Sequence, residues 1–423
     1  MEKAIYKSLT EILKEELVTA MGCTEPIAVA YCACVCRGVL GTVPESVTVK
    51  VSANILKNVK SVVVPNTGNQ RGIKTAVAAG IIANRPEAEL QVLTSLTEKQ
   101  TDEIRDFVNT VPIKVLRSDS DLIFDIETQM TANGHTALAR ISGYHTNIVE
   151  LKSDGKVLLH KEYTEEKKSK TDHSHLTVEN IIAYADTVKL KEVKAVLEHQ
   201  IECNMAIAEE GLHSNYGANI GSILLKAYGN GVYNRAKAYS AAASDARMNG
   251  SALPVVINSG SGNQGITASV PVIIYADELN VTREELLRAL IVSNLITVHL
   301  KTGIGKLSAY CGATSAGCGA AAGITYLYGG KYYEISHTIV NALAIDSGMI
   351  CDGAKASCAA KIASAVEAGL LGMQMQKNES QFYAGDGVIA KGVENTINNI
   401  SCIARDGMKD TDKTIIELMI GAD

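Results

Sequence analysis

Two cysteine-containing segments in the second half of the sequence could hold an inorganic group. CGATSAGC runs from Cys311 to Cys318 and CDGAKASC from Cys351 to Cys358, so each separates two cysteines by six residues. If each segment is helical, positions seven apart lie on one face, and the thiols would line a common wall. The small residues between them leave room for a bulky group. A buried cluster is therefore the chemistry that this spacing favours.

The spacing differs from that of common zinc and electron-transfer sites. Structural zinc ligands usually lie about two to four residues apart, and ferredoxin-type carriers use Cys-x-x-Cys-x-x-Cys runs. Neither pattern occurs in these segments, so an iron–sulfur cluster would need ligands far apart in the chain. Cys311, Cys351 and Cys358 adjoin glycine or charged residues that a structural cysteine does not need, whereas Cys318 fits either role. The simpler interpretation, a small core residue, applies to Cys32, Cys34, Cys36, Cys203 and Cys402.

One further cysteine could carry a reactive thiolate. Cys23 lies in Gly-Cys-Thr-Glu-Pro, directly before a predicted helix in which Pro26 suits the first turn. The free amides and the positive end of a helix lower the pKa of a thiol placed there. A buried turn residue is the alternative interpretation.

Two glycine-rich loops share one design. VVVPNTGNQRGIKTAV begins at Val62 and VVINSGSGNQGITASV at Val255, and both place a short apolar run before Asn, Gly, Asn-Gln and Gly. The exposed amides of such a loop, with a helix beginning just beyond, suit a carboxylate or phosphate. Tight turns that need glycine explain either loop alone, but the repetition favours a binding role. Neither loop has the spacing of a P-loop or of a dinucleotide fingerprint, so nucleotide binding is not expected.

The elements that must position these residues change in character along the chain. Helical spacing predicts helices at 5–17 and at about 26–39. Alternating or β-branched runs predict strands at 47–51, 62–64, 121–130 and in an antiparallel set over 135–160. Within that set, Asp154-Gly155 supplies the positive φ angles of a two-residue hairpin turn.

A polar run at 161–175 marks a boundary. KEYTEEKKSKTDHSH has nothing to bury, and the Ala-rich and Gly-rich sequence after it is helical in pattern. The expected fold class is α+β, with a mixed domain over 1–175 that contains antiparallel strands and a mainly helical, cluster-binding catalytic domain over 176–423. The active site should lie between the two halves, as small-molecule sites often do.

Composition excludes several classes of protein. The 423 residues are 46% hydrophobic and 20% charged, which is typical of a folded chain. The net charge of −6 is evenly mixed, so a nucleic-acid partner is not expected. No apolar stretch reaches the roughly 20 residues of a membrane span, and the acidic first helix is unlike a signal peptide. We therefore expect a cytoplasmic protein without a membrane partner; whether it forms a homo-oligomer stays open.

Five motifs together resemble one family. MGCTEPIAVA, PNTGNQRG, SGSGNQG, TGIGKLSAYCGA and MICDGAKASCAAKIA, in that order over nearly the whole chain, are similar to the L-cysteine desulfidase family, which is related to the α chain of iron–sulfur L-serine dehydratases. The resemblance implies an enzyme that needs no pyridoxal phosphate and holds a 4Fe-4S cluster with three cysteine ligands and one open iron. The matching ligands are Cys311, Cys351 and Cys358. Cys23 matches a further family cysteine, either the catalytic base or a group at the open corner, and Cys318 has no counterpart.

The implied reaction converts L-cysteine, a small-molecule substrate, to pyruvate, ammonia and hydrogen sulfide. The open iron acts as a Lewis acid on the substrate thiol, while a base, for which Cys23 is the candidate, removes the α-proton. Lys306 and Lys355, each near a proposed ligand, could add positive charge. The residues expected to bind the substrate are Asn66, Thr67, Gly68, Asn69, Gln70, Ser259, Gly260, Ser261, Asn263 and Gln264.

Three other functions compete with this one. The same cluster chemistry on L-serine would release water, and no residue in the sequence chooses between the two substrates. A non-enzymatic sensor of an amino acid or of iron–sulfur status would bind without turnover, but the sequence lacks a DNA-binding module. Pyridoxal phosphate chemistry is disfavoured because no lysine stands out beside an acid suited to the pyridinium nitrogen.

Overall fold

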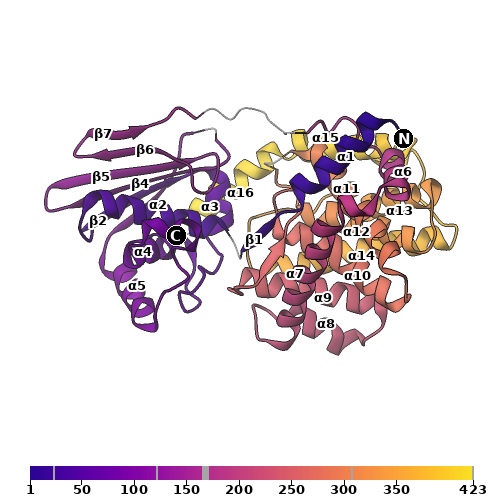
Figure 1. The fold of residues 1–423 in the computed structure, drawn as a ribbon, viewed down its shortest axis with the longest axis horizontal. Helices are drawn as coiled ribbons and strands as arrows, with labels where there is room; N and C mark the ends of the chain where they lie inside the picture. The colour runs from indigo at the N-terminus through magenta and orange to yellow at the C-terminus, as the bar shows by residue number, and fades with distance from the viewer. Residues whose placement is uncertain (22–23, 121, 164–170, 306–307, 422–423) are drawn as a thin grey trace.

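The chain folds into two lobes. A computed structural model describes residues 1–21, 24–120, 122–163, 171–305 and 308–421. Figure 1 shows a smaller lobe with a mixed sheet and helices, which we call the sheet lobe, beside a larger lobe of packed helices, the helical lobe. The N-terminal half is mixed and the C-terminal half mainly helical, so the expected α+β class is confirmed.

The sheet lobe contains a six-stranded sheet in the order β3-β2-β4-β5-β6-β7. Its strands are β2 (Ser46–Val51), β3 (Ile113–Arg117), β4 (Asp125–Ala132), β5 (His135–Ser142), β6 (Ile148–Ser153) and β7 (Lys156–His160). Only β2 and β3 pair in parallel; the other neighbours are antiparallel. The expected hairpin is present, with φ of 47° at Asp154 and 77° at Gly155. The run at 62–64 forms only one bridge, Val63 to Arg71, because the first glycine-rich loop follows it.

Helices bury the apolar side chains of this lobe. They are α2 (Thr24–Leu40), α3 (Ala53–Val59), α4 (Gly72–Ala83), the short η1 (Pro86–Gln91) and α5 (Glu98–Thr110). Helix α2 packs on the sheet, where the thiols of Cys32 and Cys36 donate to backbone carbonyls of β4 and β5. Cys34 is also fully buried, so these three cysteines are core residues, as expected.

The helical lobe packs through small side chains, as the scarcity of aromatic residues predicts. Its elements are α6 (Val178–Thr187), η2 (Leu190–Glu192), α7 (Lys194–His213), α8 (Ile220–Tyr228), α9 (Val232–Met248), α10 (Gly262–Glu278), α11 (Arg283–Ile304), α12 (Gly312–Leu327), α13 (Tyr332–Ile345), α14 (Cys358–Lys377) and α15 (Val393–Cys402). A Cβ on Gly317 of α12 would overlap the backbone of Ala365 on α14, so the two helices are nearly in backbone contact. Cys203 is buried, but Cys402, also expected in the core, is exposed at the end of α15.

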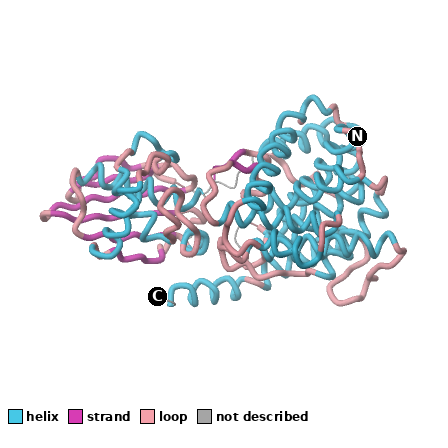
Figure 2. Tube along the Cα trace, turned by 90° about the horizontal axis from the view of Figure 1, so that it is seen from below, coloured by secondary structure: helices cyan, strands magenta, loops and turns pink. Residues whose placement is uncertain are grey.

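The two ends of the chain cross between the lobes. Helix α1 (Lys3–Glu16) lies in the helical lobe, where Leu9, Ile12 and Leu13 join the core, and β1 (Thr19–Met21) pairs with β8 (Pro254–Val256). After η3 (Ile403–Gly407), α16 (Lys409–Gly421) reaches back to the sheet lobe, as Figure 2 shows. A boundary near residue 175 stays a prediction, but each terminal helix packs with the lobe that is distant in sequence.

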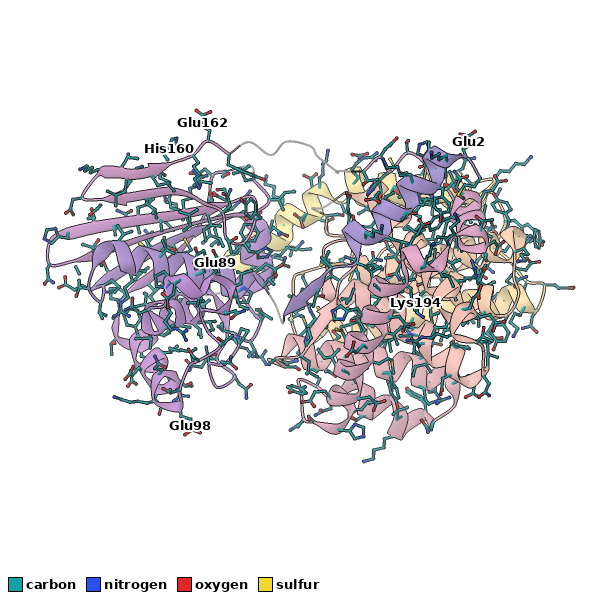
Figure 3. All side chains as sticks on the ribbon, in the orientation of Figure 1. Glu2, Glu89, Glu98, His160, Glu162 and Lys194 are labelled. Carbon is teal, nitrogen blue, oxygen red and sulfur yellow. The ribbon has the colours of Figure 1, made fainter. Side chains whose placement is uncertain are left out.

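Charged and titratable side chains lie on the outer surfaces of both lobes (Figure 3). His160 and Glu162 lie at the edge of the sheet lobe, whereas Glu2 and Lys194 lie on the helical lobe (Figure 3). Among the described residues, no helix combines the length and the apolar character that crossing a bilayer requires.

A buried carboxyl group connects α9 to α8. Asp245 of α9 is fully buried, and it accepts hydrogen bonds from the N–H groups of Ile220, at 2.6 Å, and Ala218, at 3.4 Å. These groups lie at the start of α8, where a negative charge is favourable. Burial outweighs them and raises the pKa of Asp245 to about 6.

Replacing Asp245 by Asn should therefore change how stability depends on pH. Because the folded-state pKa lies above the unfolded value, Asp245 adds stability at low pH that is lost as the pH rises through about 6. We expect the unfolding free energy of the natural protein, relative to Asp245→Asn, to fall by about 2 kcal/mol between about pH 4.5 and pH 7 in urea titrations. Asp277→Asn, at an exposed position on α10, is the control. A difference that does not vary with pH would contradict this assignment.

Candidate functional site

Cys311, Cys351 and Cys358 come together at the ends of two helices. Cys311 directly precedes α12, Cys358 begins α14, and Cys351 lies in the segment between α13 and α14. An antiparallel bridge between Tyr310 and Ile350 joins the two segments. The N–H groups of Cys311 and Cys351 each donate to a carbonyl of the opposite segment, over 2.8 and 2.6 Å. The thiols of Cys311 and Cys351 are hydrogen-bonded, and the charge of Cys351 also acts on Cys358.

The repeated cysteine spacing does not reflect a shared helical face. Cys318 lies inside α12, only 2% exposed, and its thiol donates to the carbonyl of Ile339 at 3.8 Å. Cys311 has an extended backbone, and Gly353 has a φ of 95°, which no α-helix allows. Helix α12 begins at Gly312, and the chain from Cys351 to Ser357 is not helical, so the two cysteine pairs do not each share a helical face.

Positive charges from both lobes surround the thiols. The hydrogen bond from Cys311, and then the charges of Lys57 on α3 and Lys361 on α14, hold the pKa of Cys351 well below its usual range despite burial. The hydrogen bond to Cys351 and burial raise the pKa of Cys311. Burial lowers the pKa of Lys301 on α11, and the charges of Cys351 and Cys311 oppose this shift. Cys351 is therefore the thiol whose negative charge this site favours, whereas burial raises the pKa of Cys358.

Lys57 is a site residue that the sequence did not reveal. It is 6% exposed, and its Nζ lies 2.6 Å from Asp412 of α16. A Cβ on Gly353 would overlap the backbone carbonyl oxygen of Lys57, so the cysteine segment lies directly against α3. In the sequence, Lys57 lies in the mixed run Ala-Asn-Ile-Leu-Lys-Asn-Val, which has no feature of a binding site.

Of the two lysines expected at the site, the structure describes Lys355 but not Lys306. Lys355 pairs with Asp352 and donates to the carbonyl of Gly353 at 3.2 Å, while Lys361 also pairs with Asp352, at 2.6 Å. Burial would raise the pKa of Asp352, but hydrogen bonds from these two lysines lower it to about 2. Lys355 is thus held by a carboxylate next to Cys351. Lys306 and Cys23 lie outside the described residues.

The first glycine-rich loop is tied to its own lobe. Thr67 is fully buried and donates to the carbonyl of Val64 at 2.8 Å. The amide of Gln70 donates to the carbonyls of Thr67 and Thr101, and that of Asn66 donates to a carbonyl in the segment after η1. Gly68 and Asn69 are exposed, so they present this loop to solvent.

The second glycine-rich loop lies beside the cysteines. Ser259 and Gly260 take positive φ, and Ser261 precedes α10. Within the first turn of α10, Asn263 accepts a hydrogen bond from Arg247 at 3.3 Å. Gln264 is 7% exposed and packs against Gly312, the neighbour of Cys311.

A cross-lobe contact brings the first loop towards the same region. Arg71, directly before α4, donates to the side-chain oxygen of Asn249 at 3.2 Å. Asn249 follows α9 and precedes the strand that leads into the second loop. Residues of both lobes thus meet around this segment, and the position of the active site between the lobes stays a prediction.

A further polar group lies near α3 on the sheet lobe. The side-chain amide of Asn58 donates to Glu25, at the start of α2, over 3.4 Å. Burial lowers the pKa of His145, which packs 4.6 Å from the ring of Phe124, and the charge of Glu25 opposes that shift. The sequence gave no reason to select His145, because its buried environment beside Phe124 depends on tertiary packing.

The donor atoms brought together at this site are cysteine sulfurs. Among the described residues, no group of three His, Cys, Asp or Glu side chains is arranged to hold one ion. Cys311, Cys351 and Cys358 nevertheless supply three thiols, the ligand type of iron–sulfur clusters. The positive charges of Lys57 and Lys361 offset the thiolate charge that such ligands carry.

Comparison with known proteins covers nearly the whole chain. A family model described as "Serine dehydratase alpha chain" matches residues 87–417. A UPF0597 protein of Desulfitobacterium hafniense (strain Y51) is 55% identical over 416 residues, which is 98% of this chain and 97% of the relative. UPF0597 proteins of Lachnoclostridium phytofermentans and Treponema denticola are 47% and 42% identical, with at least 98% of each chain covered.

The contact between Gly353 and Lys57 can be tested with a matched pair of glycines. Gly353→Ala would combine backbone strain with an overlap at the Lys57 carbonyl, whereas Gly385, at φ 101°, has nothing within 4 Å of an added Cβ. Gly385→Ala therefore carries the strain alone. We expect Gly353→Ala to lower the thermal midpoint by about 5 °C more than Gly385→Ala. Equal losses would show that the cysteine segment does not depend on α3.

Proposed function

Because the chain belongs to the serine dehydratase alpha chain family, we propose that it is a carbon–sulfur lyase that converts L-cysteine to pyruvate, ammonia and hydrogen sulfide with a 4Fe-4S cluster. The family resemblance of the sequence motifs is thereby confirmed at the level of the serine dehydratase alpha chain. The names of the relatives state no activity, so the reaction is our proposal.

The observation that carries the proposal is the meeting of three thiols from distant segments beside a polar loop. Cys311, Cys351 and Cys358 would hold the cluster, which supplies a Lewis-acidic iron for the leaving group of the substrate. Lys57 and Lys361 stabilise the negative charge on the sulfur ligands. The second glycine-rich loop reaches this place through Gln264, which lies against Gly312.

The residues of the chain have separate tasks in this reaction. The amides at the start of α10 bind the substrate carboxylate, since a helix N-terminus attracts anions. Cys23, which follows β1, is the proposed base, whose Sγ accepts the α-proton. Loss of the α-proton and of the hydrosulfide group, which together make up hydrogen sulfide, leaves aminoacrylate, which tautomerises and is hydrolysed to pyruvate and ammonia. Lys355 forms an ion pair with Asp352 and so offsets a negative charge next to the proposed ligand Cys351.

L-Serine is the second candidate substrate. The family description names serine dehydratase, and serine differs from cysteine only in the leaving atom. The same proton removal would then release water in place of hydrogen sulfide. A sensor that binds an amino acid without turnover is the remaining alternative.

Removal of the proposed ligands tests the cluster. After anaerobic reconstitution with iron and sulfide, the natural protein should bind about four iron atoms and four acid-labile sulfides per chain. Cys311→Ala, Cys351→Ala and Cys358→Ala should each lose most of this iron and lower turnover at least about 100-fold. Cys402→Ala, at an exposed position, should behave like the natural protein. Near-zero iron in the natural protein would remove the cluster from the proposal.

The substrate is tested by two product assays on the reconstituted protein. We expect sulfide and pyruvate in equal amounts from L-cysteine, with a kcat/KM at least about 10-fold above that for pyruvate formation from L-serine, a difference of about 1.4 kcal/mol. The reverse ranking would identify a serine dehydratase. Binding of either amino acid without any pyruvate would identify a sensor.

A further inference from the structure

Gln264 places an unpartnered polar atom at the cysteine site. The residue lies in the first turn of α10, is 7% exposed, and its Oε1 has no hydrogen-bond partner in the described part of the chain. Its carboxamide lies against Gly312, where an added Cβ would be 2.7 Å from Oε1. Since Gly312 begins α12 directly after Cys311, this acceptor atom lies against the neighbour of the proposed cluster ligand.

Arg247 places a second unpartnered group beside Gly262, which lies two residues before Gln264 in sequence. It lies in the last turn of α9, and its Nε is buried without a hydrogen-bond partner among the described residues. The guanidinium packs on Gly262, the first residue of α10, so closely that an added Cβ would overlap it. Its NH1 donates to Asn263 at 3.3 Å, but no carboxylate in the described residues pairs with it.

Folding alone does not explain these two groups. A buried donor or acceptor without a partner costs about 1–3 kcal/mol, and a bound ligand is one partner that would recover this cost. The positive charge of Arg247 at the C-terminus of α9 interacts favourably with the helix dipole. That interaction does not require the guanidinium to pack on Gly262 of α10. The helix dipole of α9 also leaves the unpartnered oxygen of Gln264 on α10 unexplained.

We infer that Arg247 and Gln264 are the two ends of a clamp for the amino-acid portion of the substrate. Arg247 binds the carboxylate together with the free N–H groups at the start of α10, a 17-residue helix that no side chain caps. Oε1 of Gln264 accepts a hydrogen bond from the α-ammonium group. The side chain of the amino acid then extends past Gly312 to Cys311.

This inference rests on the proposed function, because the clamp serves whichever amino acid reacts there. Its two contacts use groups that cysteine and serine share, so the clamp selects α-amino acids without choosing between the two. With the leaving group at the cysteine site, three substituents of the α-carbon are fixed, which also selects the L-enantiomer.

Analogues that each lack one group provide the test. 3-Mercaptopropionate has the carboxylate and no ammonium, and cysteamine has the ammonium and no carboxylate. We would measure their inhibition constants against the anaerobically reconstituted protein and its variants Arg247→Met and Gln264→Met. Arg235→Met is the matched control, because Arg235 lies on the same helix and pairs with Glu278.

The clamp predicts a crossed pattern. Arg247→Met should weaken 3-mercaptopropionate at least about 10-fold and leave cysteamine within about 2-fold, while Gln264→Met should do the reverse. Arg235→Met should change neither. If both variants weaken both analogues equally, or neither analogue, the clamp is wrong. Iron content reports whether each variant is folded, and Arg247→Lys and Gln264→Asn replace any variant that loses its iron.

A probe without a leaving group separates this inference from the proposed function. L-Alanine carries both groups and cannot react, so it should raise the thermal midpoint of the natural protein and fail to do so in Arg247→Met. If the protein produces neither sulfide nor pyruvate but shows this difference, the clamp stands and the lyase proposal falls. If turnover is found but L-alanine stabilises both proteins alike, the lyase proposal stands and the clamp falls.

Discussion

The close approach of Gly353 to the backbone of Lys57 is the contact on which the arrangement of the site depends. No side chain fits between the cysteine segment and α3, so the two lobes meet there backbone to backbone. The contact fixes Cys351 relative to the ammonium group of Lys57, whose charge lowers the pKa of that thiol. A residue with a Cβ at position 353 would separate the lobes and weaken this electrostatic effect.

The ion pair between Lys57 and Asp412 explains why the C-terminal helix returns to the sheet lobe. A buried lysine without a partner would lose much of its charge, because burial disfavours the ammonium form. Asp412 lies 2.6 Å away on α16, and Ile416 of the same helix joins the core of the sheet lobe. Since breaking a buried pair leaves an uncompensated charge, the contact with Asp412 holds α16 against Lys57.

Local patterns predicted the parts of this protein that local chemistry determines. Alternating runs and Asp154-Gly155 specified the hairpin, and the small residues of α12 specified close helix packing. The cysteine spacing does not define a shared helical face, because the chain from Cys351 to Ser357 is not helical and Gly353 has a φ of 95°. Lys57 escaped notice because its partner is 355 positions away in sequence, and only tertiary packing brings the two together.

The two glycine-rich loops show why sequence similarity alone does not locate a binding site. In the first loop, the amide of Gln70 donates to backbone carbonyls of its own lobe, so it stabilises the loop. In the second, the equivalent Gln264 has a buried oxygen without a partner among the described residues. The Gly-Asn-Gln sequence that the two loops share thus occurs in two different hydrogen-bonding environments. Because a folded chain satisfies nearly all its buried polar atoms, the loop that leaves one unsatisfied is the one poised for a ligand.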